Sequence, residues 1–274
     1  MADIIEMLSY PFIARAVIVG ILVSLCAASL GISLILKRYS MIGDGLSHVG
    51  FGALAVAQIL GFAPLAFAIP VVVLVAILLL RLSETGKIKG DAAIAAISTG
   101  SLALGVMAIS VSNGANTDLV NYMFGSILAM SDSDVTLSLA LSVCVLFLFV
   151  FFYNKIFAVT FDETFAKATG KKTAVYNTII AALTAITVVL GMRMMGALLI
   201  SALVIFPGLT AMRLFRSFSG VTICAVILSA VCFFIGMTIS YLFALPTGAS
   251  VVLVNIFAFG LFTLIGTIRN KHSH

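Results

Sequence analysis

The sequence contains few charged residues. Asp, Glu, Lys and Arg together make up 9% of its 274 residues, whereas 62% are hydrophobic. The mean hydropathy is +1.27, and several apolar runs approach the roughly 20 residues that a helix needs to span a bilayer. This composition predicts an all-α polytopic membrane protein. We expect a single transmembrane domain over residues 1–274, with no room for a separate soluble catalytic domain.

A nucleotide-binding loop is also missing. Residues 168–173, ATGKKT, look like the end of a Walker A motif. That motif requires a glycine five residues before the Gly of its GK pair, and this chain has Phe165 there. The GK pair at Lys87 fails likewise, because Arg81 occupies the glycine position. The sequence therefore predicts no ATP binding by a P-loop and no enzymatic activity, so any ATP hydrolysis must come from another polypeptide.

Neither a CxxC pair nor a cleavable leader is recognisable. The cysteines lie within apolar segments, and we expect all of them to be small buried hydrophobic side chains: Cys26, Cys144, Cys224 and Cys232. The N-terminus carries Asp3 and Glu6 and no basic residue ahead of the first apolar run. A secretory signal would begin with positive charge, so we expect this segment to be retained in the mature chain.

Nine apolar segments are candidates for membrane spans. They cover residues 12–36, 46–61, 64–81, 91–112, 133–154, 173–192, 196–213, 218–243 and 247–267. Counting residues 46–81 differently would give eight spans, so the prediction is eight to nine helices. Residues 113–132 are too polar at their start, and too short in their apolar part, to cross. They are predicted to form an outer surface helix or a re-entrant helix.

Basic residues gather at alternate ends of these segments. The groups are Lys37 with Arg38, Arg81 with Lys87 and Lys89, Lys155 with Lys167, Lys171 and Lys172, Arg213 with Arg216, and Arg269 with Lys271. Lys and Arg prefer short cytoplasmic loops, so nine spans place the C-terminus in the cytoplasm and the N-terminus outside. Arg15 and Arg193 fall on the opposite side. The net charge of +5 reflects this topology and indicates no nucleic-acid partner.

The longest of these cytoplasmic connections covers residues 155–172. Asp162 and Glu163 are followed by Lys167, Lys171 and Lys172, and Gly170 is a natural helix stop. This charge order is typical of a short helix, here lying across the membrane surface. Such a helix could dock into a groove on a partner, or the segment could be a solvated charged loop.

Asp44 and His48 are the polar pair that most needs an explanation. They lie in GDGLSHVGFG, residues 43–52, and the spacing of four places both side chains on one face of a helix. A carboxylate and an imidazole can bind one divalent cation, and ionisable groups at membrane depth usually mark an ion path. Alternatively, Asp44 caps the helix and His48 bonds a neighbouring helix. The clustered glycines favour close packing at the centre of a bundle or at a dimer axis.

Five segments, in order, resemble the membrane permease subunits of ATP-binding-cassette (ABC) transporters that take up zinc, manganese or iron. They are GDGLSHVGFG (43–52), KIKGDAAIAAISTGSLALG (87–105), FDETFAKATG (161–170), GALLISALVIFPGLTA (196–211) and PTGASVVLV (246–254). The resemblance implies a helical bundle like that of the vitamin B12 importer, in a bacterial cell membrane. It also implies a homodimer, two cytoplasmic ATPase subunits, and an external or periplasmic metal-binding protein.

The same resemblance implies roles for particular residues. Asp44 and His48 would lie in the translocation pathway, and a dimer would supply four ligands to a transported zinc, manganese or iron ion that is not stably bound. The cytoplasmic helix that couples to the ATPase would contain Phe161, Asp162, Glu163, Phe165, Ala166, Ala168 and Gly170.

Asp91 either caps its helix or contributes to an inner gate. Ser201 is expected to bond backward within its own helix or to a neighbour.

The alternative function is a secondary transporter that exchanges a metal cation for protons through Asp44 and His48. Proton-coupled exchangers tend to carry several acidic residues within their spans, whereas Asp44 stands nearly alone here. The two ligands suit zinc, manganese and ferrous iron alike, so they do not select one metal.

Overall fold

Every regular element in the described part of the chain is an α-helix. The computed structural model describes residues 6, 7, 9–84, 90–111 and 132–271. Its helices are α2 (Pro11–Leu36), α3 (Ile42–Leu60), α4 (Pro64–Glu84), α5 (Gly90–Val111), α7 (Asp132–Phe151), α8 (Tyr153–Phe161), α9 (Glu163–Ala168), α10 (Thr173–Met195), α11 (Ala197–Ala211), α12 (Phe218–Phe243) and α13 (Thr247–Lys271). The predicted outer helix, residues 113–132, falls outside the described residues except for Asp132, where α7 begins.

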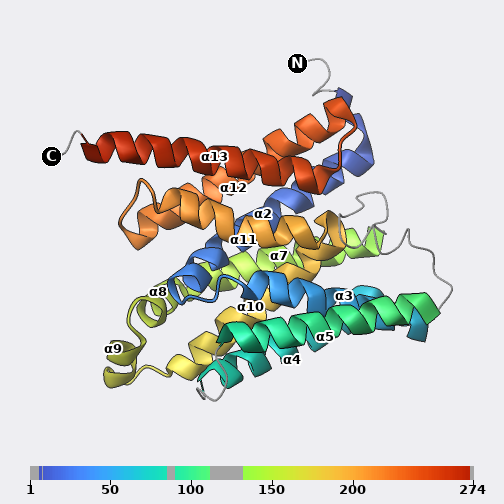
Figure 1. Cartoon of the computed structure of the whole chain (residues 1–274), viewed down its shortest axis with the longest axis horizontal. Helices are drawn as coiled ribbons and strands as arrows, with labels where there is room; N and C mark the ends of the chain where they lie inside the picture. The colour runs from blue at the N-terminus through green and yellow to red at the C-terminus, as the bar shows by residue number, and fades with distance from the viewer. Residues whose placement is uncertain (1–5, 8, 85–89, 112–131, 272–274) are drawn as a thin grey trace.

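The long helices lie side by side with their axes roughly aligned (Figure 1). Seven described helices are long and apolar enough to cross a membrane: α2, α4, α5, α7, α10, α12 and α13. The predicted count of eight or nine is not confirmed by this criterion. One of the two missing helices, α11, has only 15 residues. The other, α3, carries Asp44, His48 and Gln58, whose polar side chains lower its hydropathy.

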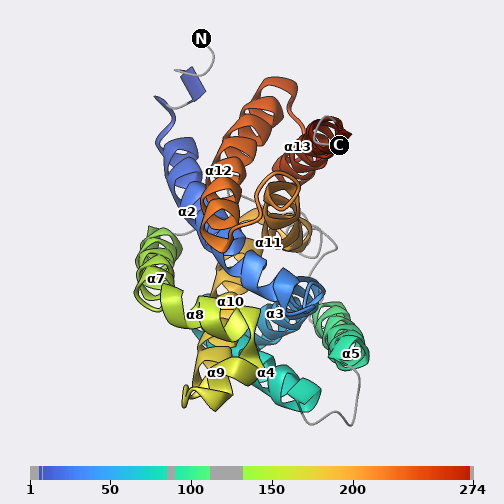
Figure 2. The ribbon, with the colours of Figure 1, turned by 90° about the vertical axis from the view of Figure 1, so that its left-hand side faces the viewer.

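The helices differ in how deeply they are buried. Within their apolar windows, 72% of α2 and 67% of α10 are buried, against 17% of α13. Figure 2 shows α5, α7 and α13 at the periphery of the bundle. Their outer faces carry exposed Leu104, Phe147 and Phe257. Exposed apolar surface of this extent suits contact with lipid. Cys144 is also exposed on α7, so the prediction that every cysteine is buried is wrong at that position.

Glycines bring α3 and α5 close together. A Cβ atom at Gly52 would lie 2.6 Å from the Ser101 carbonyl oxygen, and one at Gly45 would lie 2.5 Å from Ile94. Larger residues would therefore force the two helices apart. This contact confirms the predicted close approach and places α3 inside the bundle, where its N-terminal turn also meets α11.

The charged residues at the two ends of the bundle are paired in different ways. One end carries α8, α9 and the end of α13 (Figure 1), together with the Lys37 side chain, which contacts α9. At the other end Arg15 is paired with Asp132, and Arg193 Nη2 lies 3.7 Å from Asp134 Oδ2. The two arginines that departed from the predicted charge pattern are thus each matched by a carboxylate from α7.

The connection at residues 155–172 contains more helix than expected. The preceding helix, α7, ends at Phe151 and not near residue 154, and α8 follows after a break at Phe152. The short helix expected around Glu163 is α9, which begins directly after α8. The apolar and aromatic residues of α8 explain why this part also folds as a helix, since it packs Ile156 and Val159 into the bundle.

Candidate functional site

The corner between α2 and α3 sets the position of the candidate metal ligands. Arg38 adopts a left-handed conformation with φ of 62°. Its N–H donates to the Ile35 carbonyl at 3.0 Å, and the Tyr39 N–H donates to the Leu34 carbonyl at 2.8 Å. These are the two bonds of a Schellman motif, which ends a helix and turns the chain. As a result, α3 begins at Ile42, four residues earlier than predicted.

Asp44 lies inside the first turn of α3 and is not its N-cap. The N-cap is Met41, and no side chain caps this helix end. The capping alternative for Asp44 is therefore wrong, because the helix starts before it. A carboxylate in the first turn still interacts favourably with the positive end of the helix dipole.

Asp44 and His48 share one face of α3, as their spacing predicts. His48 Nε2 lies 3.7 Å from Asp44 Oδ2, beyond ordinary hydrogen-bond length. The His48 side chain is 22% exposed, and the Asp44 side chain is 45% exposed. Among the described residues, His48 has no hydrogen-bond partner on a neighbouring helix, so the alternative in which it bonds such a helix has no support there. The pair is close enough for both groups to contact one cation placed between them.

The pair faces a groove of about 410 Å³ between α3, α11 and α13. Its walls are mainly apolar and include Ala202, Ile205 and Val252. A carboxylate, an imidazole and the Ser201 hydroxyl are its polar side-chain groups. Oxygen and nitrogen donors of this kind suit manganese, ferrous iron and zinc.

Ser201 is a site residue that the sequence did not reveal. Its Oγ lies 3.0 Å from the Ala197 carbonyl oxygen, which is the expected backward bond within the helix. The same Oγ lies 3.3 Å from Asp44 Oδ1. Because one hydroxyl has one proton, the two acceptors compete for it. Ser201 and Asp44 are 157 residues apart in the chain, so no local pattern links them.

One chain does not complete a metal site within the described residues. No group of three or more His, Cys, Asp or Glu side chains is close enough to hold an ion there. Zinc in proteins usually has four ligands, and manganese and iron sites have more. Within the described residues, Asp44 and His48 therefore supply only part of the ligand set that such an ion needs.

The predicted coupling residues lie on and around α9. Asp162 is the N-cap, and its side chain accepts a hydrogen bond from the Phe165 N–H at 2.8 Å. Gly170, with φ of 77°, follows the helix end. Phe161 and Phe165 are 77% and 65% exposed. Within this group, Asp162 and Gly170 shape the helix, and the two phenylalanines offer apolar surface.

The remaining predicted residues hold α9 against the bundle or continue its surface. Ala166 is fully buried, whereas Ala168 is exposed. Glu163 lies 3.1 Å from the Lys37 Nζ and 3.0 Å from the Lys167 Nζ. Burial of Glu163 favours its neutral form, but the Lys167 hydrogen bond and the Lys37 charge outweigh this and lower its pKa.

Asp91 lies in the first turn of α5 and is exposed. This position suits a favourable interaction with the helix dipole, one of its two predicted roles. Its contribution to an inner gate stays a prediction.

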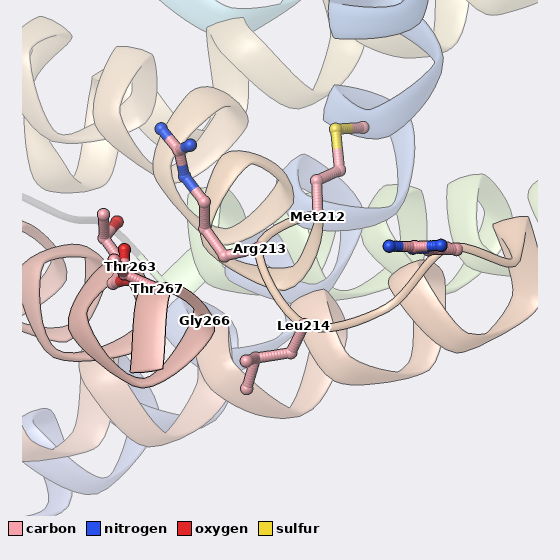
Figure 3. Close-up of a pocket in the computed structure, with 7 residues that line it drawn as sticks. Met212, Arg213, Leu214, Thr263, Gly266 and Thr267 are labelled. Atoms are coloured by element: carbon pink, nitrogen blue, oxygen red, sulfur yellow. The ribbon is translucent and has the colours of Figure 1, made fainter. Parts of the chain in front are cut away.

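A separate, more polar pocket lies between α13 and the segment after α11 (Figure 3). It has a volume of about 260 Å³ and is lined in part by Arg213, Thr263 and Thr267. Each threonine hydroxyl donates to a carbonyl of its own helix, at 2.8 and 2.9 Å. The Arg213 guanidinium lies 5.1 Å from the centre of the Phe259 ring. No carboxylate or imidazole is among the described residues that line this pocket, so those residues do not form a second candidate metal site.

Many apolar helices, together with a carboxylate and an imidazole in a groove, suit a membrane permease. A model of the ABC 3 transport family matches residues 9–266. The chain therefore belongs to this family. It is a permease of the metal-uptake ABC type, a multi-pass protein of the bacterial plasma membrane, and not an enzyme.

The chain is also similar to individual proteins over most of its length. The chain is 28% identical to the manganese transport system membrane protein MntC of Halalkalibacterium halodurans, over 94% of this chain and 89% of the relative. It is 28% identical to the high-affinity zinc uptake system membrane protein ZnuB of Haemophilus influenzae, over 90% and 94%. Its fold matches PsaBC of Streptococcus pneumoniae, solved with a Fab, with a TM-score of 0.86 and 30% identity over 95% and 94%.

Proposed function

We propose that two copies of this chain form the translocation pathway of an ATP-driven importer of zinc, manganese or iron. The observation that carries this proposal is the half-complete ligand set of Asp44 and His48. Their side chains face a groove and remain partly exposed. A second copy facing the first would bring four ligands together, enough for a transition-metal ion.

A transport site must bind its ion weakly enough to release it. The 3.7 Å separation of Asp44 and His48 leaves both groups able to turn toward an ion. The apolar walls of the groove exclude competing polar groups. In this proposal an external binding protein delivers the ion, which then passes to Asp44 and His48.

ATP hydrolysis by separate cytoplasmic ABC subunits would drive the cycle through α9. Family membership supports these partners. The exposed Phe161 and Phe165 support contact at this position, because aromatic side chains are enriched at protein interfaces. The helix would transmit movement of the ATPase to the bundle and switch the pathway between outward and inward access.

We also propose nine membrane crossings, with α3 and α11 added to the seven apolar helices, and a cytoplasmic C-terminus. Two observations support this topology. With α3 and α11 counted among the crossing helices, successive crossings alternate in direction along the bundle, and α13 ends on the same side as α8 and α9 (Figure 1). The basic residues of that side agree with a cytoplasmic location. The delivery protein would dock at the opposite end, where residues 113–132 were predicted.

The test is metal uptake in cells that lack their own high-affinity systems. Zinc, manganese and iron uptake would be compared for the wild type, Asp44→Ala and His48→Ala, with the ATPase subunit active or inactivated. Gln58→Ala is the matched control, since it removes a polar side chain from the exposed far end of α3.

We expect uptake of one metal that needs Asp44, His48 and an active ATPase, with Gln58→Ala close to wild type. Uptake that does not depend on the ATPase would favour the proton-coupled secondary transporter instead. Full activity of both Asp44→Ala and His48→Ala would contradict the assignment of the pathway.

A further inference from the structure

Lys37 joins three helices at the basic end of the bundle. It follows the last residue of α2, and its side chain is only 10% exposed. The Nζ atom donates to Glu163 Oε2 on α9 at 3.1 Å and to Asn177 Oδ1 on α10 at 2.6 Å. A nearly buried ammonium group requires such partners, because desolvation of an unpaired charge is costly.

Few other contacts hold α9 in place. The helix has six residues, and Ala166 is the only one of them that is buried. Helices this short are not stable in isolation, so packing and side-chain contacts must keep α9 ordered. The Glu163 carboxylate is its charged connection to the bundle, through Lys37.

On the other side of Lys37, the chain leads directly to the candidate metal ligands. Only residues 38–41 separate the α2 helix cap from α3, and Asp44 lies in the first turn of α3. The backbone bonds of Arg38 and Tyr39 fix the start of this corner. Its end is fixed by the Gly45 N–H, which donates to the Met41 carbonyl at 3.0 Å. Backbone hydrogen bonds therefore hold the corner at both of its ends, and a displacement of Lys37 would move α3.

We infer that Lys37 is a positioning residue that links movement of α9 to the helix carrying Asp44 and His48. This inference rests on the proposed role of α9 as the ATPase-coupling helix. The link runs from Glu163 to the Lys37 ammonium group, through the corner at residues 38–41, to the first turn of α3. Asn177 binds the same ammonium group from α10. Because α9 is thereby connected to α10 as well as to α2, it moves together with the bundle.

Lys167 provides a matched control. It contacts the same carboxylate from within α9, at 3.0 Å, and is 63% exposed. Lys37→Met and Lys167→Met make the same chemical change, since each keeps a long apolar side chain and removes one positive charge beside Glu163. Only the first breaks the connection between α9 and α2.

The experiment uses the complete transporter in proteoliposomes, with its ATPase subunits and external binding protein. For each variant we would measure ATPase co-purification, basal ATP hydrolysis, and metal ions transported per ATP hydrolysed. We expect Lys37→Met to keep co-purification and basal hydrolysis while transport per ATP falls about tenfold, a typical size for coupling between sites. Lys167→Met should keep transport per ATP close to wild type.

Charge exchange supplies a second test that does not depend on one variant folding well. Lys37→Glu combined with Glu163→Lys should recover transport per ATP relative to either single change. Loss of ATPase co-purification in Lys37→Met would overturn the inference, because Lys37 would then only stabilise the docking helix. Wild-type transport per ATP in Lys37→Met would also overturn it. Wild-type uptake without ATP dependence would instead contradict the proposed function itself.

Discussion

Asp44 and Glu163 both lie next to basic nitrogens, but their carboxylates are held to different extents. Asp44 has His48 at 3.7 Å and the Ser201 hydroxyl at 3.3 Å, and its side chain is 45% exposed. Glu163 has lysine nitrogens at 3.0 and 3.1 Å on its two oxygens and is 33% exposed. The first carboxylate is loosely held beside a groove, and the second is paired on both sides.

The difference distinguishes Asp44, a binding group, from Glu163, a structural connection between helices. The pairing of Glu163 with Lys37 and Lys167 is called the joint below. A carboxylate can accept about four hydrogen bonds or metal contacts, and Asp44 keeps most of this capacity for a ligand. Glu163 uses both oxygens within the protein. A carboxylate in a transport site must exchange partners during each cycle, whereas one in a joint must keep them. The same functional group therefore serves two purposes, according to how fully its neighbours satisfy it.

The largest expected effect comes from neutralising the loosely held carboxylate. Asp44→Asn keeps the shape of the side chain but removes its charge, so we expect metal uptake to fall by more than about tenfold. Thermal stability of the purified protein should change little, because the nearest basic group, His48 Nε2, lies 3.7 Å from the carboxylate, beyond ordinary hydrogen-bond length. Uptake assays and thermal unfolding in detergent would measure the two effects. A large loss of stability would show that Asp44 is structural after all.

Neutralising the paired carboxylate should instead destabilise the helix that carries it. Glu163→Gln leaves Lys37 nearly buried without its counter-charge, and we expect local opening of α9 to become easier by about 1–3 kcal/mol. Hydrogen exchange of the Phe165 and Ala166 amides would detect this change. The same amides should be unaffected in Asp44→Asn. Equal exchange in Glu163→Gln and wild type would mean that Glu163 does not hold the helix.

A smaller effect is expected from the hydroxyl beside Asp44. Ser201→Ala removes one hydrogen bond to the carboxylate, worth about 0.5–1.5 kcal/mol, so the metal concentration for half-maximal uptake should change about two- to tenfold. Ser110→Ala is a suitable control, because that exposed serine makes only the backward bond to Val106. If both variants behave like wild type, Ser201 does not orient Asp44.

The smallest effect is a pH dependence confined to the joint. Because the pKa of Glu163 is lowered in the folded state, its ionised form stabilises the fold. That contribution is present above the ordinary Glu pKa of about 4.3 and is lost as pH falls through the lower folded value. The difference in thermal midpoint between wild type and Glu163→Gln should therefore be constant from pH 7 to about pH 5 and shrink below about pH 4. A difference that vanished already near neutral pH would contradict the pairing.

The sequence predicted the helices well because each apolar run is a local signal. The first predicted span, residues 12–36, corresponds to Pro11–Leu36, and the span at 218–243 coincides with Phe218–Phe243. The prediction was poorest at α8, of which only Tyr153 and Asn154 fall within a predicted span, residues 133–154. Its helix depends on packing Ile156 into the bundle, a contact that no local pattern reveals.

By itself, the sequence determined the class of protein, the helical segments and the shared face of Asp44 and His48. Each of these follows from composition, or from spacing within one turn of a helix. The tertiary structure alone decided which distant groups meet those residues. Ser201 reaches Asp44 across 157 positions, and Lys37 reaches Glu163 across 126. Such pairs depend on how whole helices pack, and packing is a property of side-chain shape over the entire bundle and not of any local period.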